Sequence, residues 1–311
     1  TDKEPTFVPQ HPGIAVSQSS TINTTYVDQS GAVWLGSYRG LYQLDPVSPK
    51  FHHYGPGGES DPGFGDNTVR SILMDKQQRL WIGTHAGLLH LSKDRTIAKP
   101  VLNATFDGGQ PCRALQMDSA GHVWARSERK GLVRFDAKND HPEFIHTGNS
   151  RLTGDRGSTL YIDRQQTLFT GTGVDVIDLS RNRSSLSSEV FITDPSMPFS
   201  PTTIVEDEQG TYWAATDNDG LFAFQLERPS FHIRNIEHFP CELEDSSGIA
   251  APYITSIRED RIGNIWFGTY GGGLHRLSKA NRHIHQYSMN DGLPNNTVYA
   301  IEIDVRDRIW F

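Results

Sequence analysis

DRIGNIWFGTYGGGL, residues 260–274, contains an Asp-x-x-Gly turn, a short strand centred on Trp266, a glycine-rich turn and the start of a second strand. Short apolar runs bounded by Gly and Asp are typical of a β-hairpin. Asp260 can accept hydrogen bonds from the backbone that follows it, and Gly263 suits a turn position with positive φ. The stretch predicts two antiparallel strands, and it is the clearest copy of a unit that recurs along the chain.

Seven copies of this unit occur, each marked by the aspartate of its first turn. These aspartates are Asp28, Asp75, Asp118, Asp163, Asp207, Asp260 and Asp304. They lie 43 to 53 residues apart, and a period of about 45 residues with several short strands is typical of a propeller blade. We therefore predict an all-β, seven-bladed β-propeller with four antiparallel strands in each blade, forming a single domain over residues 1–311.

Two positions of the unit carry structural predictions. A tryptophan stands six residues after the aspartate in six copies, and Phe169 replaces it in the fourth. An indole ring is large enough to fill the wedge between neighbouring blades, so we predict a core role for it. Gly is the fourth turn residue in four copies, whereas Gln78, Gln166 and Asp307 replace it in the others. Those three turns are expected to be more strained or of another type.

The seventh copy begins at Asp304 and runs only to Phe311. We therefore expect an incomplete seventh blade and a chain that is a fragment of something longer. An open strand edge is a liability in solution. Either the segment around residues 6–9 completes the blade in part, or a neighbouring chain covers its edge.

Composition excludes several classes of function. The net charge is −8 with histidine neutral, which argues against a nucleic-acid partner. No apolar run approaches the roughly 18 residues of a membrane helix. Residues 271–273 are glycines, but they join two strands and precede no helix, so a phosphate-binding loop is not predicted.

The two cysteines, Cys112 and Cys241, do not form a C-x-x-C pair, so we predict no zinc site. They allow two interpretations: free thiols, or one long-range disulfide across one face of the propeller. We also predict no other metal and no cofactor. The turn at 217–219 is rich in Asp but lacks the ligand spacing of a known calcium loop.

Candidate ligand contacts come from the turns between the second and third strands of each blade. In a propeller these turns share one face around the central channel with the connections between successive blades. Simple turns would carry Gly, Asn and Asp throughout, but these differ strongly in charge and size. The candidates are Tyr38, Arg39, His85, Arg126, Glu128, Arg129, Asp217, Asp219 and Tyr270.

The repeat resembles the two-component regulator propeller family. Its pattern, roughly N-x-V-x-x-I-x-x-D-x-x-G-x-x-W-x-G-T-x-x-G-L, is matched from Asn67 to Leu88 and again from Ile257 to Leu274. Residues 291–298, DGLPNNTV, are similar to a connection of that family. The resemblance covers nearly the whole chain from about Thr21.

The resemblance implies a function that the repeat pattern alone does not. Members are typically sensory portions of membrane-spanning bacterial receptors, with the propeller outside the cytoplasmic membrane and a histidine kinase or diguanylate cyclase as output. Several respond to carbohydrates. We therefore expect a periplasmic, non-catalytic sensor that contacts the remainder of its receptor chain, binds a small molecule such as a saccharide, and has the option of forming a homodimer.

Two alternatives belong to other classes. Streptogramin lyases are seven-bladed propellers with related repeats that place His and Glu on the channel face with a metal, and His85 with Glu128 are the residues available for such a role. The other alternative is a purely structural or dimerising propeller without a ligand.

Overall fold

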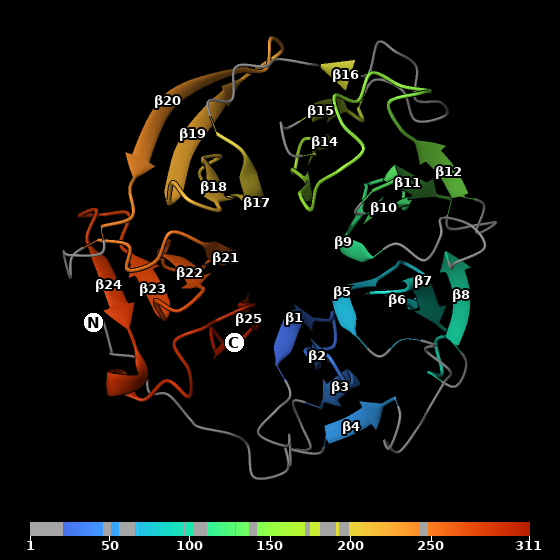
Figure 1. Ribbon diagram of the computed structural model, residues 1–311, viewed down its shortest axis with the longest axis horizontal. Helices are drawn as coiled ribbons and strands as arrows, with labels where there is room; N and C mark the ends of the chain where they lie inside the picture. The colour runs from blue at the N-terminus through green and yellow to red at the C-terminus, as the bar shows by residue number, and fades with distance from the viewer. Residues whose placement is uncertain are drawn as a thin grey trace.

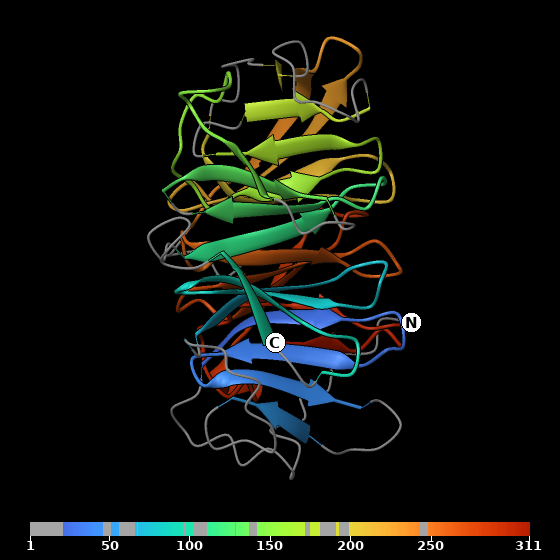
Figure 2. The same ribbon diagram turned by 90° about the vertical axis from the view of Figure 1, so that its right-hand side faces the viewer.

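The computed structural model describes residues 21–45, 51–55, 66, 68–95, 98–102, 111–127, 129–136, 142–171, 175–180, 191–192, 199–242 and 248–311. Within these ranges the chain forms six four-stranded antiparallel sheets and one two-stranded sheet, placed around a common centre (Figure 1). Seen from the side, the ring is a flattened disc (Figure 2). Consecutive strands pair in chain order, so each blade is a meander.

The strands fall into four classes by their position in the blade (Figure 1). The innermost are β1 (Ile22–Val27), β5 (Val69–Met74), β9 (Cys112–Met117), β13 (Leu160–Ile162), β17 (Pro201–Glu206), β21 (Ile254–Glu259) and β25 (Glu302–Ile303). The second are β2 (Val33–Ser37), β6 (Leu80–Thr84), β10 (Val123–Ser127), β14 (Thr167–Thr170), β18 (Tyr212–Thr216), β22 (Ile265–Thr269) and β26 (Ile309–Trp310).

The third strands are β3 (Gly40–Leu44), β7 (Gly87–Leu91), β11 (Gly131–Phe135), β15 (Asp175–Asp178), β19 (Leu221–Glu227) and β23 (Leu274–Leu277). The outermost are β4 (Phe51–Tyr54), β8 (Ala98–Leu102), β12 (Pro142–Ile145), β16 (Phe191–Ile192), β20 (His232–Phe239) and β24 (Ile284–Tyr287). A 3₁₀ turn, η1 (Met289–Asp291), follows β24. Across the described ranges, no helix has both the length and the apolar character needed to cross a bilayer.

The predicted propeller of four-stranded antiparallel blades is confirmed, but the predicted number of seven blades is wrong. Six blades have four strands, and the seventh copy forms only the two-stranded sheet β25–β26. That copy has residues for two strands, because only seven follow Asp304. The small sheet lies between β21 and β1, and Trp310 packs against Val33, Leu35 and Leu44 of blade 1. The segment around residues 6–9 lies outside the described residues.

A carboxylate organises each turn between the first and second strands. Asp75 accepts backbone N–H groups of Gln77 and Arg79 on Oδ1, both at 2.9 Å, and the indole Nε1 of Trp81 on Oδ2 at 2.8 Å. The same indole-to-carboxylate bond recurs in five further copies, at 2.8 to 3.1 Å. All seven turn aspartates are buried. Each therefore fixes its turn and, except in the fourth copy, the tryptophan of the next strand.

The fourth turn position has a left-handed backbone in every copy. Gly263 has φ 86°, and Gln78, Gln166 and Asp307 have φ of 62 to 66°. The expectation of another turn type is therefore wrong for these three residues. A left-handed backbone is less favourable for a residue with a Cβ than for glycine, so of the two expected alternatives greater strain is the one compatible with these φ angles.

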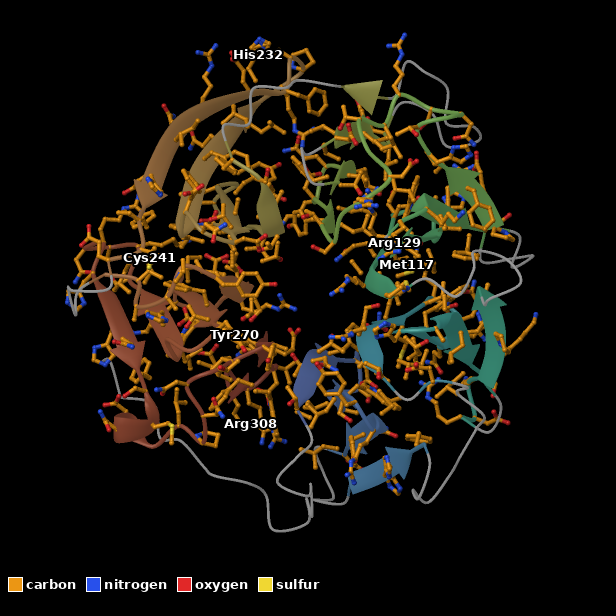
Figure 3. The ribbon with its side chains drawn as sticks, in the orientation of Figure 1. Met117, Arg129, His232, Cys241, Tyr270 and Arg308 are labelled. Atoms are coloured by element: carbon orange, nitrogen blue, oxygen red, sulfur yellow. The ribbon has the colours of Figure 1, made fainter. Side chains whose placement is uncertain are left out.

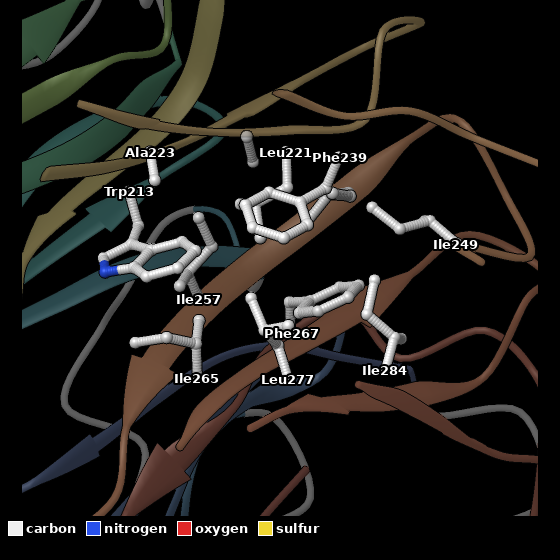
Figure 4. Close-up of a cluster of buried hydrophobic side chains, with 12 residues drawn as sticks. Trp213, Leu221, Ala223, Phe239, Ile249, Ile257, Ile265, Phe267, Leu277 and Ile284 are labelled. Carbon is white, nitrogen blue, oxygen red and sulfur yellow. The ribbon is translucent and has the colours of Figure 1, made fainter. Parts of the chain in front are cut away.

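The apolar core lies between blades. Figure 4 shows the cluster between the fifth and sixth blades, where Trp213 of β18 packs with Ile257 of β21 and Ile265 of β22. Five of the six tryptophans are buried, which confirms their predicted core role. Trp310, in the two-stranded sheet, is only partly buried.

The fourth blade keeps its turn carboxylate bonded although Phe169 has no N–H to offer. Tyr212 of the next blade donates its hydroxyl to Asp163 Oδ2 at 2.7 Å, and Arg228 also donates to this oxygen. Burial and the bonded Asp163 raise the pKa of Tyr212. The positions equivalent to Tyr212 in other blades are aliphatic, for example Leu80. A residue of the neighbouring blade thus replaces the missing indole.

We expect Tyr212→Phe to lower the free energy of unfolding by about 1–3 kcal/mol, because it removes a buried bond to a carboxylate. Phe169→Trp should recover part of that loss in the Tyr212→Phe background, since the indole N–H can then reach Asp163. Chemical denaturation of the two single variants and the double variant measures this coupling. Strictly additive effects would show that the hydroxyl does not replace the indole.

Candidate functional site

The turns between second and third strands meet the starts of the innermost strands on one face of the disc. The N–H of His85 donates to the carbonyl of Thr68 at 3.1 Å, and that of Tyr270 to Tyr253 at 3.0 Å. Buried hydroxyls close the turns from inside, as when Thr269 donates to the carbonyl of Gly273 at 2.9 Å. We call this surface the channel face. Its described residues include Tyr38, Arg39, Arg70, His85, Arg113, Arg129, Arg156, Asp217, Asp219, Tyr253, Tyr270 and Tyr299.

Seven of the nine candidate contacts from the sequence are exposed on this face: Tyr38, Arg39, His85, Arg129, Asp217, Asp219 and Tyr270. Figure 3 places Arg129 and Tyr270 on opposite sides of the central opening. Arg126 is different, because it belongs to strand β10 and is 0% exposed. The expectation that Arg126 is a turn residue is therefore wrong. Glu128 lies outside the described residues.

Sequence reasoning missed the residues that the innermost strands bring to the face. Five innermost strands skip one residue in their pairing with the second strand, which is a β-bulge. The skipped residues are Asn23, Arg70, Arg113, Thr202 and Thr255. The two threonines and the asparagine donate to a carbonyl of the next blade. The two arginines extend onto the channel face, and a long basic residue among short polar ones was the signal available in the sequence.

Four tyrosines form what we call the tyrosine shelf: Tyr38, Tyr253, Tyr270 and Tyr299. The ring centroid of Tyr270 lies 6.4 Å from that of Tyr253 and 6.1 Å from that of Tyr299, both edge-to-face. The guanidinium of Arg70 sits 5.3 Å from the ring centroid of Tyr38. Partial burial, with Tyr270 and Tyr38 nearby, raises the pKa of Tyr299. The shelf is 36 to 58% exposed, so its rings are open to solvent.

Three arginines line a pocket of about 300 Å³ on the same face. Arg113 comes from the bulge of β9, Arg129 from the turn after β10, and Arg156 from the segment before β13. Gly157 and Ser158 complete the described lining. We call this the arginine pocket. Burial and Asp217 raise the pKa of Tyr253, and the charge of Arg113 partly opposes this rise, so Arg113 of the pocket acts electrostatically on a tyrosine of the shelf.

Buried Arg126 supports the wall of this pocket. Its Nη2 donates to the carbonyl of Arg156 at 2.7 Å and to that of Gly154 at 3.2 Å. Desolvation lowers its pKa, which nearby Asp175 partly opposes. At the equivalent position, blade 2 has Gly83, where a Cβ would lie 2.4 Å from the carbonyl oxygen of Cys112. Blade 3 therefore accommodates the Arg126 side chain at a position where blade 2 has no room for any side chain.

A buried histidine fixes the segment that leads to the shelf. His275 of β23 is 0% exposed, stacks on Phe267 with centroids 4.9 Å apart, and accepts the N–H of Ala250 on Nε2 at 3.2 Å. Burial lowers the pKa of His275 to about 4. The imidazole is therefore neutral at physiological pH, as an acceptor of this bond must be.

No group of three or more His, Cys, Asp or Glu is placed to hold a metal in the part of the chain that is described. The exposed His85 therefore has no partners there for a lyase-type metal site. Cys112 is buried and Cys241 half-buried, and both are free thiols. The alternative of a disulfide between them does not hold.

Two segments of the chain, residues 63–86 and 248–271, match the model of the two-component regulator propeller. The chain carries two-component regulator propeller repeats. The chain is 26% identical over 253 residues to a protein named histidine kinase P4 from Formosa agariphila. The aligned part is 76% of the chain but 17% of that protein.

Solved structures share the fold of the chain. The extracellular domain of a B. thetaiotaomicron protein, described as a hybrid two-component system, has a TM-score of 0.71 and 17% identity, covering 93% of this chain and 38% of that one. Virginiamycin B lyase from Staphylococcus aureus, inactive and with quinupristin, has a TM-score of 0.68 and 13% identity, covering 94% and 95%. At such identities, the likeness shows the propeller fold alone.

Replacing Arg126 with Met should loosen the pocket wall, because the carbonyls of Gly154 and Arg156 lose a charged donor. We expect backbone amides at 152–158 to exchange hydrogen about tenfold faster, which corresponds to about 1.4 kcal/mol of local stability. Arg129→Met is the control, since this exposed turn residue does not bond to the segment. Equal exchange in wild type and Arg126→Met would contradict the supporting role.

Stability should fall as the pH drops from about 6.5 to about 4, because unfolded His275 binds a proton there and folded His275 does not. The difference in pKa sets the upper limit of this loss at about 3 kcal/mol. His275→Phe keeps a ring on Phe267 but cannot titrate. The advantage of wild type over this variant in urea denaturation should therefore shrink through that window. A difference that is independent of pH would contradict the assignment.

Proposed function

We propose that this chain is the ligand-sensing propeller of a bacterial signal-transduction receptor, lies outside the cytoplasmic membrane, and binds a saccharide on its channel face without catalysing a reaction. The tyrosine shelf carries the proposal. Of the ten tyrosines in the chain, the four that are exposed all lie in this cluster. A gathering of exposed aromatic rings on one face marks a binding surface.

The chemistry of the shelf favours a saccharide. A tyrosine presents an apolar ring and a polar hydroxyl, and a sugar presents a C–H face and a rim of hydroxyls. The edge-to-face rings of Tyr253, Tyr270 and Tyr299 offer surfaces in more than one plane. Exposed Asp217 and Asp219 stand on the same face and can accept hydrogen bonds from sugar hydroxyls.

The receptor context rests on the repeats and on the length of the relative. The chain spans about a sixth of the length of the kinase that it resembles. We propose that the remainder of a longer receptor supplies a kinase or cyclase output and is the partner of this propeller. Variable turns on a regular frame suit this role, because the frame holds the turns in place while their residues change.

We expect Tyr270→Ala to weaken saccharide binding about tenfold, because loss of a stacked ring costs about 1.4 kcal/mol. An oligosaccharide array followed by calorimetry on the best binder measures this change. Ile236→Ala is the matched control, since Ile236 is 45% exposed on the outermost strand β20. Both variants should unfold at similar temperatures in the absence of ligand.

Saturating saccharide should stabilise the wild type by about 2.7 kcal/mol at 100 times its dissociation constant. If Tyr270→Ala binds the saccharide as tightly as the wild type does, the tyrosine shelf is not the binding site. If no saccharide binds and dimerisation depends on the propeller, the structural alternative replaces this proposal. Turnover of a streptogramin that is lost in His85→Ala would instead favour the lyase alternative.

A further inference from the structure

We infer that the ligand carries an anionic group, a carboxylate or a sulfate ester, and that Arg113, Arg129 and Arg156 bind it in the arginine pocket. This inference rests on the proposed saccharide function and narrows it to acidic saccharides. The three guanidinium groups reach one pocket of about 300 Å³ from three separate segments. Their convergence is therefore a product of the fold and not of one basic stretch of sequence.

The positive charge of the pocket contrasts with the negative net charge of the chain. The chain has a net charge of −8, yet the described lining of the pocket contains three arginines and no acidic side chain. Like charges at close range repel one another, and a bound anion relieves that repulsion. Arginine is also the residue best shaped for two-pronged hydrogen bonds to carboxylate and sulfate-like oxygens.

The size of the pocket fits one charged group with part of its sugar ring. About 300 Å³ is at the lower end of small-molecule sites. Gly157, at φ 144°, has a backbone conformation that side chains rarely adopt, so the lining stays small there. The hydroxyl of exposed Ser158 adds a donor beside the guanidinium groups.

The pocket and the tyrosine shelf share the channel face, with Arg129 and Tyr270 on opposite sides of the central opening (Figure 3). Burial and Asp217 raise the pKa of Tyr253, and the charge of Arg113 partly opposes this rise. Buried Arg126 bonds to the carbonyl of Arg156 at 2.7 Å, which holds that segment in place before a ligand arrives. A ligand that stacks on the shelf can therefore place an acidic substituent among the arginines, and little ordering is needed on binding.

Calorimetry on the intact chain tests the inference with matched sets of neutral, uronic-acid and sulfated oligosaccharides. We expect the best acidic saccharide to bind ~30-fold more tightly than its neutral counterpart at low salt, and this preference to shrink as salt rises. Arg129→Gln and Arg156→Gln should each remove most of the preference, because they weaken binding of the acidic saccharide far more than binding of the neutral one. Arg234→Gln is the control, because Arg234 lies exposed on the outermost strand β20. The uronic-acid and sulfated arms show which anion the pocket accepts.

The outcomes separate this inference from the proposed function. If neutral and acidic saccharides bind with equal affinity, and if Tyr270→Ala weakens the binding of both, the saccharide function stands. The inference that the ligand carries an anionic group is then wrong. If no saccharide binds, the saccharide function fails and inorganic sulfate becomes the probe. If millimolar sulfate slows hydrogen exchange of the backbone amides that line the arginine pocket, and if Arg156→Gln abolishes this protection, the anion site is upheld without the saccharide function. Absence of that protection would overturn it.

Discussion

The hydrogen bond from a tryptophan Nε1 to a turn aspartate is the interaction on which this propeller depends. It joins the turn between the first two strands to the side chain that fills the space between blades, so one carboxylate sets both local and interblade geometry. Buried carboxylates are costly unless their oxygens are hydrogen-bonded. Here Oδ1 takes backbone N–H groups and Oδ2 the indole, so a unit that has the tryptophan offsets the cost of burial with its own donors.

The fourth blade shows how strict this requirement is. Phe169 fills the apolar space of the indole but offers no donor, and Asp163 is nevertheless 2% exposed. The neighbouring blade supplies Tyr212 and Arg228 to the same oxygen. Blades four and five are therefore joined at this turn carboxylate by a buried polar contact as well as by apolar packing. The unit that lacks the indole donor is thus the one whose neighbour carries a tyrosine at this position.

Much of the fold could be predicted from sequence because the unit repeats. The spacing of the aspartates predicted the four-stranded blades, and Trp266 and its equivalents were correctly assigned to the core. Interblade effects could not be predicted in this way, because they depend on which residue faces which across the wedge. Arg126 was misplaced for this reason: its position looks like a turn in the sequence, whereas the strand β10 continues to Ser127.

The sequence predicted the turn residues of the candidate site but not the residues that the innermost strands contribute. Exposed turn residues such as Tyr38, Arg129 and Tyr270 follow from their departure from turn chemistry. Arg113 did not, because a β-bulge changes the direction of one side chain, and its long basic residue stands out only once the bulge positions of the blades are aligned. Once the position of the bulge in the repeat is known, its five residues can be compared directly in the sequence: Asn23, Arg70, Arg113, Thr202 and Thr255.

That comparison also explains why the site has two chemically different sides. A short polar side chain at the bulge is used up in bonding to the next blade, as Thr202 bonds to the carbonyl of Ile254. An arginine there is long enough to extend past that carbonyl onto the face. The bulge arginines occur in blades two and three, whereas three of the four shelf tyrosines come from the sixth blade and the connection to β25. Variation at a few positions of a rigid repeat is thus sufficient to set a basic side against an aromatic side across one channel.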